Sequence, residues 1–298
     1  MSSPDQKLVS INPVDVLLWT FRRNETDVVN LYDALTSLMQ IATGGNMLNF
    51  GYWKEGTSNP FEAQTNLCRM VADMAEMKDA QNVLDIGSGF SEPATIWKKD
   101  YPHLKISCIN VNQKQLASAA GIIKENADPS LSHGINLINS TATKLPLADN
   151  SVDRIIALES AQHFKPFSDF VIEGKRILKR NGVLVLAIPV MTRTAKSLEL
   201  FKLGILSFTW SSEHYALDNI RHMIERSGLK ITSMNMIGSK VYQPLADYYV
   251  KNREFLRARI LGQYPSYIEK ILFKSLVKMR DVSENTTIDY VLLKSVAE

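Results

Sequence analysis

The chain has 298 residues, of which 45% are hydrophobic and 22% are charged, and its formal net charge at pH 7 is +3. This composition excludes a disordered or fibrous protein, and the charge is too small to require a polyanionic partner such as a nucleic acid. No apolar run reaches the ~18 residues that a membrane span needs, and no leader peptide is visible. Two cysteines, Cys68 and Cys108, do not make a disulfide framework, so we expect a cytoplasmic globular protein.

The spacing of apolar residues predicts an alternation of helices and short strands along most of the chain. Strands are expected at 83–86, 106–110, 135–138, 154–158, 183–188, 229–237 and 288–293. Helices are expected at 13–42, 61–77, 94–99, 195–208, 217–227 and 242–283, the last one interrupted by Gly262 and Pro265. This order predicts an α/β fold with a seven-stranded sheet, helices on both faces, and helical additions before the core, after the fifth strand and between the last two strands.

A glycine turn follows the first predicted strand, in the sequence Val-Leu-Asp-Ile-Gly-Ser-Gly-Phe-Ser at 83–91. Gly87 and Gly89 let backbone N–H groups approach a ligand, and the next helix presents its positive N-terminus. We expect a side chain at Gly87 to enter the space of that ligand. Asp85 would repel a pyrophosphate, but it suits a ligand that carries an ammonium group. The turn therefore favours S-adenosylmethionine over a dinucleotide.

Five ordered segments, covering roughly 80–190, resemble the core of class I S-adenosylmethionine-dependent methyltransferases. They are the glycine turn at 83–91, the second strand end at 106–116, the loop at 141–153, the fourth strand and its exit at 154–164, and the fifth strand with its preceding turn at 176–187. The resemblance implies a Rossmann-like methyltransferase sheet. It also implies an N-terminal helical cap at 1–78, a cofactor-binding core at 79–190, and lid helices with the remaining core strands at 191–298.

Short N-terminal sequence motifs narrow the resemblance to the subgroup that methylates sugars, polyketides, sterols, isoprenoid chains and phosphobases. They are Tyr32-Asp33, Gly44-Gly45-Asn46 and the run from Asn49 to Trp53. In that subgroup the Gly-Tyr-Trp segment folds over the cofactor. The resemblance therefore implies a small-molecule acceptor and disfavours nucleic acid and protein substrates.

The resemblance places the cofactor on residues from each of these segments. The expected cofactor-binding residues are Tyr52, Trp53, Gln64, Asp85, Gly87, Ser88, Gly89, Asn110, Val111, Gln115, Thr141, Ala142, Glu159 and His163. Two positions depart from the family pattern. Asn110 stands where an acid usually holds the ribose, with Gln115 as a possible supplement, and Thr141 stands where an aspartate often meets the adenine.

His163 and Glu159 are the candidate catalytic residues, because both follow the fourth strand at the sheet edge where the acceptor should approach. An imidazole with a pKa near neutrality can remove a proton from a hydroxyl or ammonium group, but His163 can equally shape the cofactor pocket. Expected acceptor contacts are Phe164, Phe201, Trp210 and Tyr215, with the apolar helix at 195–208 lining a greasy cavity. No metal-ligand spacing is seen, so we expect no metal.

The sequence thus predicts methyl transfer to a lipophilic or amphipathic metabolite, with oxygen preferred over carbon or nitrogen as the acceptor atom. A nicotinamide-dependent dehydrogenase shares the strand-turn-helix pattern, but Asp85 and the missing acid at position 110 disfavour it. A binding protein that keeps the cofactor pocket without transfer chemistry is the remaining alternative, because Asn110 and Thr141 could weaken cofactor binding.

Overall fold

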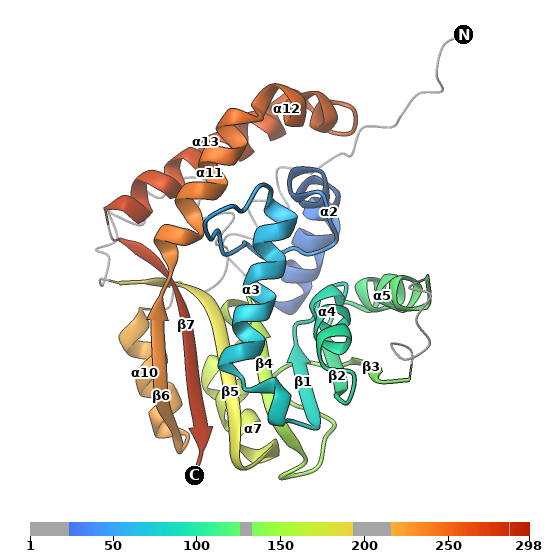
Figure 1. Ribbon diagram of the computed structural model, residues 1–298, viewed down its shortest axis with the longest axis vertical. Coiled ribbons are helices and arrows are strands. Elements are labelled where there is room, and N and C mark those ends of the chain that lie inside the picture. The colour runs from blue at the N-terminus through green and yellow to red at the C-terminus, as the bar shows by residue number, and fades with distance from the viewer. Residues whose placement is uncertain (1–23, 126–132, 193–215, 286) are drawn as a thin grey trace.

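The computed structural model describes residues 24–125, 133–192, 216–285 and 287–298 (Figure 1). Its centre is a seven-stranded sheet in the order β3-β2-β1-β4-β5-β7-β6. The strands are β1 (Asn82–Ile86), β2 (Lys105–Asn110), β3 (Ile135–Asn139), β4 (Val152–Leu158), β5 (Leu178–Met191), β6 (Leu229–Met236) and β7 (Ile288–Ala297). The first five are parallel and β7 runs antiparallel to both neighbours. The predicted seven-stranded α/β fold is confirmed, strand by strand.

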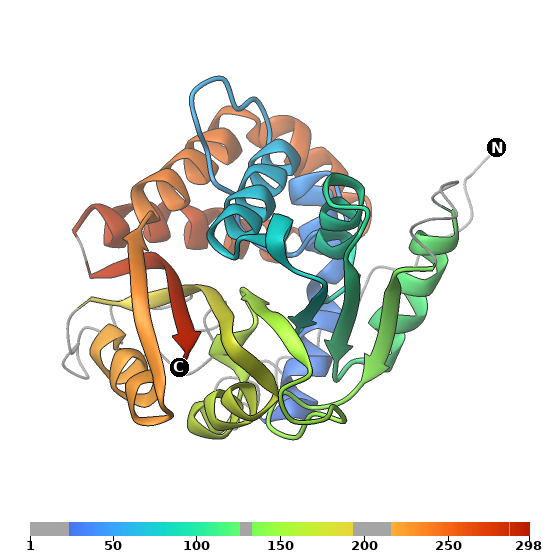
Figure 2. The ribbon, with the colours of Figure 1, turned by 60° about the horizontal axis from the view of Figure 1, so that its bottom comes forward.

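Helices cover both faces of this sheet, which is why its central strands are apolar on both sides. One face carries α3 (Pro60–Met74), α4 (Glu92–Asp100) and α5 (Gln113–Glu125), and the other carries α7 (Phe167–Ile177) and α10 (Leu217–Arg226). Adjacent residues divide between the two cores: Val83 belongs to the core that contains Trp97 of α4, whereas Leu84 belongs to the core that contains Phe170 of α7. Figure 2 shows the two helical layers above and below the strands.

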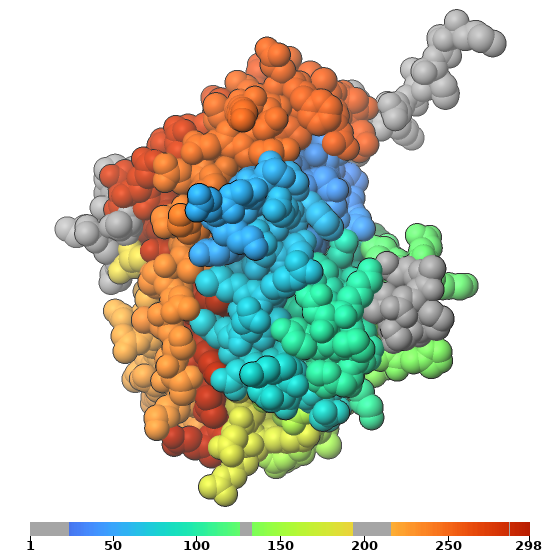
Figure 3. All heavy atoms as spheres, in the orientation of Figure 1, coloured from blue at the N-terminus to red at the C-terminus, as the bar shows by residue number. Residues whose placement is uncertain are grey.

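A further helical layer lies beyond the sheet, next to the α3 face. It contains α2 (Glu25–Thr43), α11 (Tyr242–Lys251), α12 (Arg253–Leu261) and α13 (Ser266–Glu284). In Figure 1 these helices form the upper part of the molecule, and Figure 3 shows atoms of α3 closing the face between α4 and the orange α11–α13 segment. Within the described residues, no helix combines the length and apolar character that crossing a membrane requires.

The structure divides two of the expected helices. The segment expected to be helical to residue 77 leaves the α-helix after Met74 and continues as the short 3-10 helix η1 (Met77–Asp79). The expected helix at 242–283 breaks at Asn252 as well as at Gly262, which are the C-cap residues of α11 and α12. Residues 13–23 and the expected helix at 195–208 lie outside the described residues.

Candidate active site

The glycine turn after β1 is shaped by a close contact with the loop that follows β4. Gly87 has φ 73°, and a Cβ atom placed there would lie 2.3 Å from the Cβ of Ser160. Gly89 has φ 55°, and a Cβ there would meet nothing within 4 Å. The expectation for Gly87 therefore needs correction: a side chain at Gly87 collides with Ser160, whereas the space around a Cβ atom at Gly89 is open.

Asp85 is buried at the end of β1 and carries an unmatched carboxylate oxygen. Its side chain is 2% exposed, and its Oδ2 atom has no hydrogen-bond partner among the described residues. Burial raises the pKa of Asp85 to about 7. A cationic group at this position would satisfy the free oxygen and favour the ionised carboxylate.

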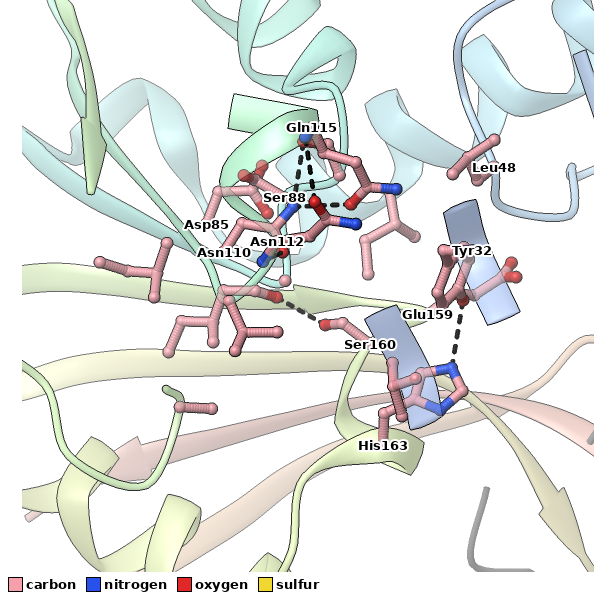
Figure 4. Close-up of a pocket in the computed structure, with 18 of the residues that line it drawn as sticks. Tyr32, Leu48, Asp85, Ser88, Asn110, Asn112, Gln115, Glu159, Ser160 and His163 are labelled. Carbon is pink, nitrogen blue, oxygen red and sulfur yellow. Dashed lines mark hydrogen bonds between the residues drawn. The ribbon is translucent and has the colours of Figure 1, made fainter. Parts of the chain in front are cut away.

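Three amide side chains form a network at the end of β2 (Figure 4). The Asn110 Nδ2 atom donates to the Gly89 carbonyl at 3.2 Å and to Gln115 Oε1 at 2.9 Å. The Oδ1 atom of Asn112 accepts from the backbone N–H of Gln115, so Asn112 stabilises the start of α5. The bond from Asn110 fixes which end of the Gln115 amide is the oxygen, and the buried Gln115 Nε2 atom has no partner among the described residues. The amide at position 110 thus holds the glycine turn and orients the side chain of Gln115, whose Nε2 donor is unpartnered.

A first cavity of about 120 Å³ collects the residues of this edge of the sheet. Eleven of the fourteen expected cofactor-binding residues line it, namely Asp85, Gly87, Ser88, Gly89, Asn110, Val111, Gln115, Thr141, Ala142, Glu159 and His163. Phe164, expected to contact the acceptor, lines this same cavity. On the α2 side, Glu25 closes the wall by accepting a hydrogen bond from Thr141 Oγ1.

A second cavity of about 250 Å³ adjoins the first and is walled mainly by α2, α11 and α13. Trp53 and Gln64 line this second cavity rather than the first, and Tyr52 lines neither, with its backbone N–H donating to the Ala63 carbonyl at 2.8 Å. The two cavities share five lining residues, which we call the junction: Tyr32, Leu48, Asn49, Glu159 and His163. The other expected acceptor contacts, Phe201, Trp210 and Tyr215, lie outside the described residues.

At the junction, Tyr32 of α2 meets His163, which lies in the short helix η2 (Ala161–His163) after β4. The Tyr32 hydroxyl and His163 Nε2 are 3.1 Å apart, and Figure 4 shows the two side chains facing each other. The buried Nδ1 atom of His163 has no partner among the described residues. Desolvation lowers the pKa of His163 to about 4 and raises that of Tyr32. The imidazole is therefore neutral at pH 7, and its expected titration near neutrality needs correction.

Glu159 stands beside this pair in a strained backbone conformation, with φ 50°. Its Oε1 atom accepts from the Phe50 backbone N–H and from the Tyr290 hydroxyl, each at 2.8 Å. Desolvation raises the pKa of Glu159 to about 8 despite these two hydrogen bonds. No arginine or lysine of the described chain forms an ion pair with it. Glu159 is thus mostly protonated at pH 7 unless a cation approaches it.

Several residues of the site were not expected from the sequence. They are Glu25, Tyr32, Leu48, Asn49 and Asn112, all lining the first cavity, together with Tyr290, which holds Glu159. Asn112 carried a local signal, because an asparagine directly before a helical run is a typical N-cap. Tyr32 and Asn49 stand in the short segments that narrowed the resemblance, but neither was assigned a place in the site. No group of three or more potential metal ligands occurs in the part of the chain that the structure describes.

Comparison with known proteins agrees with this geometry. Residues 84–186 match a family model described as a methyltransferase domain. The chain is 25% identical to erythromycin 3''-O-methyltransferase of Saccharopolyspora erythraea, with 78% of each chain covered. It is 27% identical to 27-O-demethylrifamycin SV methyltransferase of Amycolatopsis mediterranei, covering 88% of this chain and 93% of that protein.

A solved structure shows the same fold at lower identity. The cyclopropane synthase MmaA2 of Mycobacterium tuberculosis superposes with a TM-score of 0.78 at 14% identity, covering 91% of this chain and 98% of that one. The fold, the matched domain and the curated relatives agree with the cavity built around Asp85 and the glycine turn. The chain is a class I S-adenosylmethionine-dependent methyltransferase of the small-molecule type, with S-adenosylmethionine as its cofactor.

Proposed function

We propose that this enzyme transfers the methyl group of S-adenosylmethionine to a hydroxyl oxygen of a lipophilic or amphipathic metabolite. The observation that carries the proposal is the junction, where a cavity lined by cofactor-type residues meets a larger, mainly apolar one. Transfer between two bound molecules depends chiefly on their placement, and correct placement can supply about 7–11 kcal/mol in favourable cases.

The first cavity fits the cofactor through atoms that have no partner within the described chain. The Oδ2 atom of Asp85 suits the ammonium group of the methionine part, and Gln115 Nε2 suits a ribose hydroxyl. Thr141 and Ala142 take the adenine side. S-adenosylmethionine supplies an electrophilic methyl group on a sulfonium, and a partly dry pocket favours the loss of that positive charge during transfer.

His163 is proposed to receive the proton of the acceptor hydroxyl. In the tautomer with the proton on Nε2, that N–H donates to the Tyr32 oxygen and leaves the lone pair of Nδ1 free. Because desolvation keeps the imidazole neutral, the lone pair is available across the neutral pH range. Tyr32 then positions the ring, so that its Nδ1 atom faces a single direction.

The second cavity supports an uncharged acceptor. Its described walls contain neither lysine nor arginine, so an anionic head group would find no cation there. The cations of the 242–283 region are engaged in part elsewhere: Arg253 pairs with the buried Glu269 at 2.9 Å. The names of the erythromycin and rifamycin methyltransferases specify methylation of oxygen, which supports a hydroxyl over a carbon or amine acceptor.

Incubation with isotope-labelled S-adenosylmethionine and a metabolite extract tests this proposal. We expect one labelled product, identified by mass spectrometry, whose methyl group is lost on ether cleavage. The His163→Ala protein serves as the control and should give far less product. A label that stays on carbon or nitrogen after ether cleavage, or the absence of any labelled product, would contradict the proposal.

A further inference from the structure

The described chain concentrates its unmatched buried polar atoms around the two cavities. Nine buried side-chain nitrogen or oxygen atoms have no hydrogen-bond partner among the described residues. Eight of them belong to residues that line the cavities: Trp53, Gln64, Asp85, Gln115, Gln162, His163, Tyr249 and Ser275. Leaving a buried polar group unpaired costs about 1–3 kcal/mol, so native proteins pair nearly all of them. Such a concentration indicates atoms whose partners are ligands.

Gln64 lines the second cavity, and its buried side-chain oxygen has no hydrogen-bond partner among the described residues. The residue is 1% exposed on α3, and its Nε2 atom donates to the carbonyls of Met47 at 3.0 Å and Asn49 at 2.6 Å. Because both partners are acceptors, the nitrogen position is fixed and the unpartnered atom must be the oxygen. Asn49 belongs to the junction, so the amide of Gln64 is anchored at the reaction end of the cavity.

Gln162, in η2, has the same hydrogen-bonding arrangement as Gln64. It is 7% exposed, and its Nε2 atom donates to the carbonyl of Glu159 at 2.7 Å, which again fixes the amide and leaves Oε1 free. Glu159 is also a junction residue. Two residues that line the second cavity therefore carry an unpartnered amide oxygen, and the amide nitrogen of each donates to a backbone carbonyl of the junction.

An amide oxygen can only accept hydrogen bonds, so it selects O–H or N–H groups and disfavours carbonyl, ether or carboxylate oxygens. Most of the cavity wall farther from the junction is apolar, with Leu35 and Leu38 from α2 and Ile268, Leu272 and Leu276 from α13. Trp53, Tyr249 and Ser275 add polar atoms outside the junction, of which the indole N–H can only donate. The cavity thus offers hydrogen-bond acceptors near the reacting atoms and apolar surface beyond them.

We propose that the second cavity binds the hydroxyl-bearing part of a polyol or sugar ring through the side-chain oxygens of Gln64 and Gln162, with the apolar remainder of the acceptor between α2 and α13. One hydroxyl of that ring receives the methyl group, and its neighbours donate to the two amides. This assignment rests on the proposed O-methyl transfer and adds the substrate class to it. A site that needs two donors discriminates strongly against an analogue that lacks them, because its buried oxygens are then left unpaired.

Two probes of the same skeleton test the assignment by calorimetry on the full chain saturated with S-adenosylhomocysteine. Octyl β-D-glucoside carries four hydroxyl donors, whereas 2-octyloxytetrahydropyran carries none. Gln64→Met and Gln162→Met keep the side-chain length but remove the acceptor oxygen. We expect each substitution to weaken glucoside binding by roughly 2- to 10-fold relative to the wild type, as the loss of one hydrogen bond implies. The affinity for the ether should stay within about 2-fold of the wild-type value. Gln263→Met, an exposed residue, is the matched control and should change neither affinity.

The outcomes separate this assignment from the proposed function. Equal weakening of both probes, unchanged binding of the glucoside in both variants, or a wild type that does not bind the glucoside would overturn the polyol site. Gln64 also holds the Met47 and Asn49 carbonyls, so the S-adenosylhomocysteine affinity and melting temperature of each variant are measured as well. If Gln64→Met unfolds, the Gln162→Met protein still decides the question. A wild type that fails to bind S-adenosylhomocysteine would contradict the proposed function itself.

Discussion

Glu159 should release a proton when S-adenosylmethionine binds, and much less when S-adenosylhomocysteine binds. The desolvated carboxyl has a pKa of about 8, so about nine-tenths of it is protonated at pH 7. A sulfonium at the junction favours the carboxylate, whereas the thioether of the product carries no charge. The expected release from Glu159 is therefore up to about 0.9 proton for the substrate and near zero for the product. Asp85, with a pKa of about 7, adds about 0.5 proton to both.

The other titratable groups near Glu159 do not obscure this signal. Tyr32, Tyr242 and Tyr290 all have a raised pKa and stay neutral, and His163 has a lowered pKa and also stays neutral. Because the pKa of Glu159 is raised in the free protein, the affinity for S-adenosylmethionine should fall as the pH falls below about 8, by up to ~10-fold per unit. The affinity for S-adenosylhomocysteine should follow Asp85 alone.

Calorimetry in two buffers of different ionisation enthalpy measures the number of protons released. The wild type should show a difference of about 0.9 proton between the two ligands at pH 7, and Glu159→Gln should abolish it. Glu284→Gln, an exposed residue near the end of α13, should keep the full difference. Equal proton release for both ligands in the wild type, or an undiminished difference in Glu159→Gln, would refute the reasoning.

Three further predictions follow from the same site. Gly89→Ala should weaken S-adenosylhomocysteine binding with only a small drop in melting temperature, whereas Gly87→Ala should destabilise the fold through its contact with Ser160; the reverse order in calorimetry and thermal melting would contradict the turn geometry. Asp85→Asn should weaken S-adenosylhomocysteine binding about 10- to 100-fold. The raised pKa makes ionisation of Asp85 destabilising, so the melting temperature of the free wild type should fall as the pH rises from about 4 through 7, and Asp85→Asn should reduce this fall. The same pH dependence of melting temperature in both proteins would exclude this role. His163→Ala should lower kcat by roughly 10²–10⁴ with little change in cofactor affinity. In the wild type, titration of His163 should cause no change in kcat between pH 6 and 8. A modest rate loss coupled to weaker cofactor binding would make His163 a pocket residue only.

The strands and the glycine turn could be predicted from the sequence because their signals are local. Val83 and Leu84 alternate between two cores, and Gly87 and Gly89 both require φ above zero, as their position in the turn suggested. The contacts that a side chain in the turn would make could not be predicted. That a side chain at Gly87 would meet Ser160 depends on the loop after β4, more than seventy residues away in the sequence.

Of the five junction residues, the sequence predicted only Glu159 and His163 as site residues, because the contacts that build the junction join distant segments. Tyr32 and His163 are separated by 131 residues, and so are Glu159 and Tyr290. The pKa of His163 is lowered by burial in the folded chain, so an expectation based on a free imidazole placed it near neutrality. Gln64 was assigned to the cofactor by resemblance, but the carbonyls of the 47–49 segment hold its amide against the second cavity.

A crystal structure of the complex with S-adenosylhomocysteine tests the central claim most directly. The two-cavity arrangement predicts the ligand's amino group within hydrogen-bond distance, about 3 Å, of Asp85 Oδ2. It also predicts the sulfur atom at the junction of Tyr32, Glu159 and His163, pointing toward the second cavity. A ligand whose adenine lies at Asp85, or whose sulfur faces away from the second cavity, would contradict the account.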